Sequence, residues 1–252
     1  AGEGGLAWGE GPERRRSEDG ALELTREYAV AAAGGERRLR LREFPYSAHP
    51  RSGVRGTGGV VWAGALALAA LAQEQRAELL GEGCTRILEI GAGCGLAGLV
   101  VAALAGGEAR TLLTDENEAV LENLRHNVAA NAAALASRVD VARLAWEAVL
   151  NRSELPPMEE VDLLLGSDVI WGDRGPLVGR LALRLVRPGG RLVISAQKGR
   201  EGLEDFVSII TCASSSAATD AKSDLPFQVV ASSAVVADEE IVHYVCRRLT
   251  AN

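Results

Sequence analysis

An apolar strand that runs directly into three alternating glycines is the feature that most restricts how this chain folds. Residues 87–95 are Ile-Leu-Glu-Ile-Gly-Ala-Gly-Cys-Gly, and Asp115 follows the next apolar segment, 111–114. Glycines at a strand end let the backbone pass close under a ligand, because a Cβ would clash there and several positions need positive φ. A carboxylate at the end of the following strand can accept both hydroxyl hydrogens of a ribose. Together these features predict a nucleotide-type pocket.

Hydrophobic periodicity around this turn predicts an α/β domain with a Rossmann-like sheet. Strands are expected at 86–90, 110–114, 139–144, 161–165 and 191–195, and helices near 60–72, 96–105, 116–131, 177–186 and 201–212. Such alternation is typical of a parallel sheet. The last apolar runs, 227–236 and 241–249, are separated by so few residues that they must pair as an antiparallel hairpin. We therefore expect five parallel strands and a C-terminal hairpin, seven strands in all.

The N-terminal part of the chain predicts a separate β extension. Residues 1–20 contain six glycines and many charges, so a disordered tail is expected. Strand-like alternation at 22–25 and 39–42 flanks two glycines and predicts a β-hairpin or small sheet within residues 21–58. Residues 53–59 are expected to form a flexible joint, and the main domain spans 59–252.

Composition limits the classes of partner. The chain has 252 residues, 47% of them hydrophobic, and a net charge of −7, which disfavours non-specific binding to nucleic acid. The longest apolar run, 60–72, is too short for a bilayer that needs about 20 residues. Four cysteines and three histidines lack metal or disulfide spacing, so we expect no metal site and a cytoplasmic location, with the nucleus as a second compartment. The chain begins at Ala1 without a secretory leader, and a truncated start is expected.

Two cofactor classes compete for the glycine loop. Gly93-Cys-Gly95-Leu-Ala-Gly98 formally matches the G-x-G-x-x-G pattern of dinucleotide oxidoreductases. In dinucleotide-binding proteins that pattern begins at the first glycine after the strand. In this chain the first glycine after the strand is Gly91, two residues before the start of the match at Gly93. The spacing therefore disfavours a dinucleotide.

The set Glu89-x-Gly91-x-Gly93-x-Gly95 with Asp115 resembles the seven-β-strand methyltransferases, which bind S-adenosylmethionine. More narrowly, the chain resembles the protein lysine methyltransferases that modify elongation factors, molecular chaperones, valosin-containing protein and calmodulin. The matching stretches are 59–66 with Trp62, the loop 87–98, the helix with Asn123, Asn127 and Asn131, Leu144-Ala-Trp146, Ser167-Asp168-Val-Ile-Trp171, and Arg200 with Phe206.

This resemblance implies S-adenosylmethionine as cofactor and a role for each site residue. Glu89 is expected near the aminoacyl part, Asp115 at the ribose, and Trp62 and Trp146 beside the adenine and aminoacyl parts. Asp168 is expected to contact the cofactor and to lie beside the methyl acceptor, a lysine of a non-histone protein substrate. Trp171 stands where the family has Tyr and so lacks the phenol hydroxyl; we count it with Asp168 as a candidate catalytic residue.

Structural alternatives exist for most of these residues. Glu89 can cap the loop, Asp115 can be a helix N-cap, and the tryptophans can be core aromatics. The asparagines at 123, 127 and 131 lie on one helical stripe, where we expect a polar face with local hydrogen bonds.

Three functions stay open at this level. They are a protein lysine methyltransferase, a small-molecule N- or O-methyltransferase of the same fold, and a cofactor-binding interaction protein without turnover. The adenine-methylating (D/N)PP(Y/F) signature is absent after 161–165, which disfavours base methylation. We expect a monomer.

Overall fold

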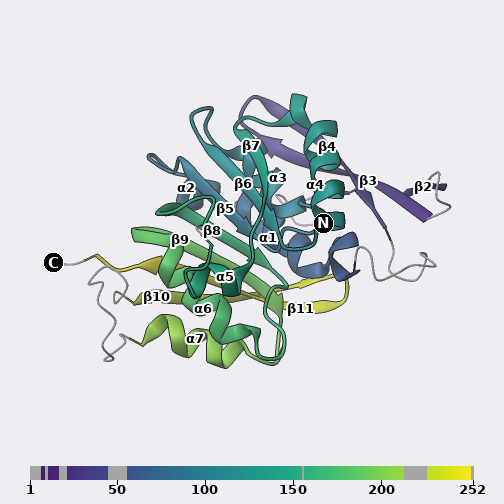
Figure 1. Ribbon diagram of the computed structural model, residues 1–252. Coiled ribbons are helices and arrows are strands. Elements are labelled where there is room, and N and C mark those ends of the chain that lie inside the picture. The colour runs from purple at the N-terminus through teal and green to yellow at the C-terminus, as the bar shows by residue number, and fades with distance from the viewer. Residues whose placement is uncertain are drawn as a thin grey trace.

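A seven-stranded sheet forms the centre of the molecule, with strand order β10-β11-β9-β8-β5-β6-β7 (Figure 1). The computed structural model describes residues 7–8, 11–16, 22–44, 56–154, 156–212 and 226–250. Its parallel strands are β5 (Arg86–Ile90), β6 (Arg110–Asp115), β7 (Arg138–Arg143), β8 (Val161–Ser167) and β9 (Val186–Gln197). The expected α/β class with five parallel strands is confirmed.

The C-terminal strands β10 (Phe227–Val236) and β11 (Glu239–Arg248) pair with each other and with β9 in antiparallel fashion. Ala237 and Asp238 connect them, with φ of 51° and 64°. Positive φ at both central residues is the geometry of a two-residue hairpin turn whose twist matches the strands. The predicted hairpin is therefore confirmed.

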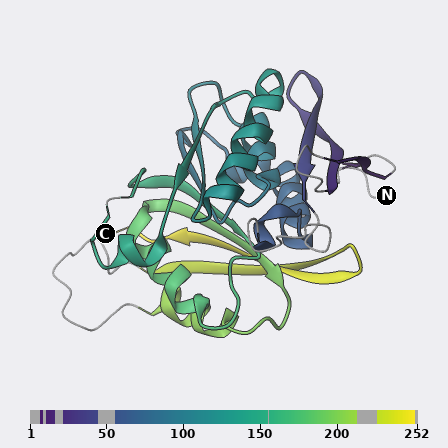
Figure 2. The ribbon, with the colours of Figure 1, turned by 45° about the vertical axis from the view of Figure 1, so that its right-hand side comes forward.

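Helices cover both faces of this sheet (Figures 1 and 2). They are α1 (Ala63–Glu74), α2 (Arg76–Leu79), α3 (Leu96–Leu104), α4 (Glu118–Ala130), α5 (Trp146–Leu150), α6 (Arg174–Leu185) and α7 (Leu203–Thr211). The one-turn helices α2 and α5 have no counterpart in the sequence prediction, because one turn carries too little periodicity. No helix in the described ranges is long and apolar enough to cross a membrane.

Successive residues of the central strands pack into two different apolar clusters. Ile87 of β5 lies in the cluster that contains residues of α1, α3 and α4, whereas Leu88 lies in the cluster with α6 and α7. Side chains alternate between the faces of a strand, so a continuous apolar run serves both layers. Glu89 consequently points to the same face as Ile87, toward α3.

The N-terminal extension is a small antiparallel sheet. Strands β3 (Leu22–Ala32) and β4 (Gly35–Glu43) form the predicted hairpin, and Gly34 and Gly35 adopt positive φ at its turn. Strands β1 (Ala7–Trp8) and β2 (Glu13–Arg16) pair with β3. The prediction of a disordered tail is wrong for these six residues, and the other residues of 1–20, apart from Gly11 and Pro12, lie outside the described ranges.

The flexible joint expected at 53–59 is instead a short helix in the part that the structure describes. Gly56–Gly59 forms a 3₁₀ helix, and three residues separate it from α1, while 53–55 lie outside the described residues. The division of the chain into an extension, 21–58, and a main domain stays a prediction.

Two asparagine side chains, Asn127 of α4 and Asn131 at the C-cap of that helix, bind the free edge of β4. Asn131 Oδ1 accepts a hydrogen bond from the Arg40 amide at 2.7 Å, and Asn131 Nδ2 donates to the Arg40 carbonyl at 2.8 Å. Asn127 bonds the Arg42 amide and carbonyl in the same way, at 2.9 and 3.1 Å. A primary amide has one acceptor and two donors, so it replaces a neighbouring strand. The expectation of local hydrogen bonds on this stripe is therefore wrong, apart from the bond of Asn131 to the Asn127 carbonyl.

Asn127→Ala is expected to destabilise the protein by about 3 kcal/mol, because the Arg42 amide and the Cys94 carbonyl lose the bonds from this side chain, while the Arg42 carbonyl keeps its bond from Asn123. Besides its two bonds to Arg42, Asn127 Nδ2 donates to the Cys94 carbonyl at 2.9 Å. Urea unfolding of the wild type and the variant measures the difference. Glu122→Ala, on the exposed side of the same helix, is the matched control and should change stability by less than about 0.5 kcal/mol. Equal losses in both variants would contradict the importance of this bonding.

Candidate active site

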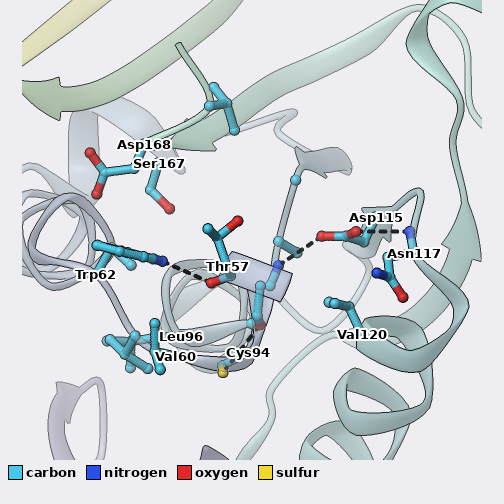
Figure 3. Close-up of a pocket in the computed structure, with 18 of the residues that line it drawn as sticks. Thr57, Val60, Trp62, Cys94, Leu96, Asp115, Asn117, Val120, Ser167 and Asp168 are labelled. Carbon is cyan, nitrogen blue, oxygen red and sulfur yellow. Dashed lines mark hydrogen bonds between the residues drawn. The ribbon is translucent and has the colours of Figure 1, made fainter. Parts of the chain in front are cut away.

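A cavity of about 270 Å³ opens at the carboxyl ends of β5, β6 and β8 (Figure 3). Open α/β sheets bind ligands at this edge, where the connecting loops diverge. The structure brings most of the predicted residues together here: the cavity is lined by Trp62, Gly91, Gly93, Gly95, Asp115, Trp146, Asp168 and Trp171. Glu89 is not among the lining residues.

The three glycines after β5 have backbone conformations that side chains disfavour. Gly91, Gly93 and Gly95 have φ of 59°, 54° and 85°. A Cβ on Gly91 would lie 2.8 Å from Val169 Cγ1, and one on Gly95 would lie 2.4 Å from Leu124 Cδ1. Glycine is therefore required at these positions for both space and conformation. The loop presents bare backbone to the cavity, as a ligand cradle does.

Asp115 lies at the end of β6. One of its carboxylate oxygens bonds the glycine loop, and the other bonds the turn that follows β6. Oδ2 accepts from the Gly93 amide at 3.3 Å, and Oδ1 accepts from the Asn117 amide at 3.1 Å (Figure 3). A carboxylate oxygen has more than one lone pair, so each keeps capacity for a ligand hydroxyl. Burial raises the pKa of Asp115. The N-cap of α4 is Asn117, whose side chain accepts from the Ala119 amide, so the alternative of Asp115 as N-cap is wrong.

Glu89 lies beneath the glycine loop. Its Oε2 accepts from the Gly98 amide, in the first turn of α3, at 3.0 Å, and the residue is 1% exposed. Burial, and in smaller part the charge of Asp115, raises the pKa of Glu89 to about 8. Glu89 therefore caps the loop, which is the alternative to cofactor contact given for this residue from the sequence.

Asp168 follows β8 and holds the first turn of α1. Its φ is 53°, its Oδ2 accepts from the Gly64 amide at 2.8 Å, and its own amide donates to the Ser195 carbonyl. A carboxylate is favoured at a helix N-terminus, where amide hydrogens point outward. The second oxygen, Oδ1, is buried and has no hydrogen-bond partner among the described residues. Burial raises the pKa of Asp168, while the Gly64 amide, the charge of Arg200 and the Gln197 amide oppose that rise. An unpaired buried acceptor beside a cavity is suited to a ligand that donates hydrogen.

Aromatic rings border the cavity with an arginine between two of them. The Arg174 guanidinium carbon lies 5.8 Å from the Trp146 ring centre and 5.3 Å from that of Trp171, within cation–π range. Trp171 is 54% exposed and Trp62 44%, which agrees with places at an opening and not in the core. Arg174 was missed by sequence reasoning, because an arginine in the first turn of a helix carries no distinctive signal.

Two residues of the family resemblance lie elsewhere. Phe206 is fully buried and packs edge-on against the Tyr244 ring with a centroid distance of 5.8 Å. Arg200 donates to Gln197 Oε1 at 2.8 Å. Neither lines the cavity. In the described part of the chain no group of three or more His, Cys, Asp or Glu residues is placed to hold a metal ion.

Comparisons with known proteins agree with this geometry. A family model described as lysine methyltransferase matches residues 49–213. The chain is 29% identical over 147 residues to EEF1A lysine methyltransferase 3 of Xenopus tropicalis, covering 58% of this chain and 60% of that protein. It is 37% identical over 117 residues to protein N-lysine methyltransferase METTL21A of Danio rerio, covering 46% and 49%. The matched region thus spans between half and three fifths of these relatives.

Solved structures share the fold. An O-methyltransferase from Bacillus cereus in complex with SAH superposes with a TM-score of 0.54 at 20% identity, covering 76% of this chain and 83% of that one. Fibrillarin from Aeropyrum pernix with bound S-adenosyl-L-methionine gives 0.52 at 16% identity, covering 93% and 94%. At such identities the likeness concerns the fold alone.

Glu89→Gln is expected to gain stability relative to the wild type as the pH rises from about 4.5 to about 8. Because the pKa of Glu89 is raised from 4.5 to about 8 in the folded chain, the proton stabilises the fold fully below pH 4.5. That contribution is lost as the pH rises through 8. Glutamine keeps an acceptor for the Gly98 amide and does not ionise. Urea unfolding at about pH 5 and pH 8.5 measures the effect, with the exposed Glu122→Gln as control. A difference independent of pH would refute the burial argument.

Proposed function

Because the chain belongs to the lysine methyltransferase family, we propose that it transfers a methyl group from S-adenosylmethionine to a lysine side chain of a non-histone protein. One observation carries the proposal: a glycine cradle, Asp115 and Asp168 line one cavity. All the lining residues fall within the matched range, 49–213. The lysine acceptor is supported by relatives whose names specify lysine.

The residues present fit this cofactor. Gly91, Gly93 and Gly95 line the cavity without side chains, so the loop backbone is accessible to a ligand. Asp115 would accept the ribose hydroxyls. Trp62 and Trp146 would border the adenine and aminoacyl parts, while Glu89 would support the loop from below through the Gly98 amide.

The chain's main task in the reaction is to place a neutral amine. When bound, S-adenosylmethionine supplies a methyl group made electrophilic by its positive sulfur. A lysine with the ordinary pKa of about 10.4 is almost wholly protonated at neutral pH and must release a proton before it attacks. The Asp168 carboxylate, at the cavity wall, would accept an N–H of the ammonium and orient it, and water would take the released proton. Trp62 and Trp171 flank the opening and limit the approach to one line, which favours in-line transfer.

The cysteines and the net charge bear on the compartment and on the class of partner. All four cysteines are free thiols, which supports a reducing, cytoplasmic location. The net charge of −7 supports a protein acceptor over a nucleic acid. The monomeric state stays a prediction.

The proposal predicts that labelled S-adenosylmethionine transfers its label to lysine in a cell lysate when the protein is added. Hydrolysis and amino-acid analysis of the labelled proteins identify methyl-lysine. Asp168→Asn keeps an acceptor for the Gly64 amide but presents an amide in place of a carboxylate, and is expected to lower the turnover rate by about 100-fold. Labelled small molecules without labelled lysine would support the small-molecule alternative. Cofactor binding without any transfer, with transfer restored by Trp171→Tyr, would support the non-catalytic one.

Asp115→Asn is expected to weaken S-adenosylhomocysteine binding about tenfold, because a charged acceptor of the ribose hydroxyls is lost, at about 1.5 kcal/mol. Titration calorimetry measures the affinity. Asp140→Asn is the matched control, since Asp140 lies on β7 and pairs with Arg110 and Arg138 outside the cavity. Unchanged affinity in Asp115→Asn would count against the ribose role.

A further inference from the structure

One wall of the cavity is a short segment that precedes α1. Residues 57–62, here called the strap, line the cavity through Thr57, Gly58, Val60, Val61 and Trp62. The strap packs directly on the glycine loop and on α4. The Gly58 carbonyl is 3.6 Å from Cys94 Sγ, and a Cβ on Gly58 would lie 2.8 Å from Val120 Cγ2. The strap is therefore in contact with the loop at Gly58, and the position of its other end, Val61 and Trp62, sets the width of the cavity.

The N-terminal sheet holds the strap at two points. Glu43, the last residue of β4, accepts a hydrogen bond from the Val61 amide through Oε2 at 2.9 Å. The next amide along the chain, that of Phe44, donates to the Gly59 carbonyl at 2.6 Å. Among the described residues, no other side chain accepts a hydrogen bond from the Val61 amide. Glu43 is thus the side-chain link between the extension and the strap.

Glu43 is buried, which makes its partners decisive. The residue is 4% exposed, and its second oxygen, Oε1, accepts from Arg26 Nε at 2.9 Å. A buried carboxylate is costly unless each oxygen is bonded. Arg26, on the adjacent strand β3, and Val61 supply these bonds. Both bonds depend on one position of the carboxylate, so the sheet fixes the strap with little freedom.

The same strand is tied to the glycine loop from the other side. Asn127 of α4 bonds the Arg42 backbone and the Cys94 carbonyl. Strand β4 and the loop are therefore both fixed to one helix. Because α4 fixes β4 relative to the glycine loop, the bond between Glu43 and Val61 fixes the Val61–Trp62 end of the strap relative to the loop as well.

We propose that Glu43 is a positioning residue for the cofactor cavity: it holds the Val61–Trp62 end of the strap at the separation from the glycine loop that S-adenosylmethionine needs. The N-terminal sheet is then part of the cofactor site and not only a surface for the acceptor. This inference rests on the proposed function.

Calorimetry with S-adenosylhomocysteine on the full chain tests the inference. Glu43→Leu fills the buried volume without an acceptor and is expected to weaken binding more than tenfold. Glu43→Gln offers an amide oxygen to the Val61 amide and should recover affinity to within about threefold of the wild type. Glu27→Ala removes exposed ion pairs to Arg38 and Arg40 in the same sheet and should leave affinity unchanged.

Amide hydrogen exchange separates positioning from loss of fold. In Glu43→Leu the Val61 amide should exchange faster, whereas the Arg42 amide, bonded to Asn127, should stay protected. If both amides lose protection, Glu43→Gln decides: retained protection of Val61 together with a loss of affinity above tenfold overturns the inference. It is also overturned if Glu43→Leu binds like the wild type, or if Glu43→Gln binds no better than Glu43→Leu. A wild-type protein that does not bind S-adenosylhomocysteine would instead refute the proposed function.

Discussion

The two-sided pairing of asparagine amides with the β4 backbone is the interaction on which the site depends. Buried peptide groups must find partners, and an edge strand that lies against a helix has none in the helix backbone. Asn127 and Asn131 supply them, and Asn127 also bonds the Cys94 carbonyl of the glycine loop. Helix α4 thereby becomes the common support of the N-terminal sheet and of the loop, and the cavity is assembled from three elements distant in sequence.

Features with a local physical cause were predictable from the sequence. Gly91, Gly93 and Gly95 stand where positive φ and bare backbone are needed, and Asp115 ends the adjacent strand, so their meeting follows from the parallel order of β5 and β6. The hairpin of β10 and β11 follows from the shortness of its connection. The family resemblance extended this reasoning to Trp62, Trp146, Asp168 and Trp171, all of which line the cavity.

Features that depend on long-range pairing were not predictable. A stripe of asparagines has the same pattern whether it faces water or a strand edge, and only the tertiary fold decides. Strand β2 is a charged segment of four residues that is ordered by pairing with β3. Glu89 has the spacing of a ligand-binding residue, yet its side-chain direction is set by the alternation of β5, which turns it toward α3 and away from the cavity.

Two carboxylates from different sheets hold the backbone on either side of Trp62. Glu43 bonds the Val61 amide, and Asp168 bonds the Gly64 amide. The main chain at the tryptophan is therefore fixed at both ends, and the ring keeps only its own torsions and the bond from Nε1 to the Thr57 carbonyl. A change in the position of the ring therefore requires a side-chain rotamer change that breaks the bond to Thr57, because the backbone on both sides is held.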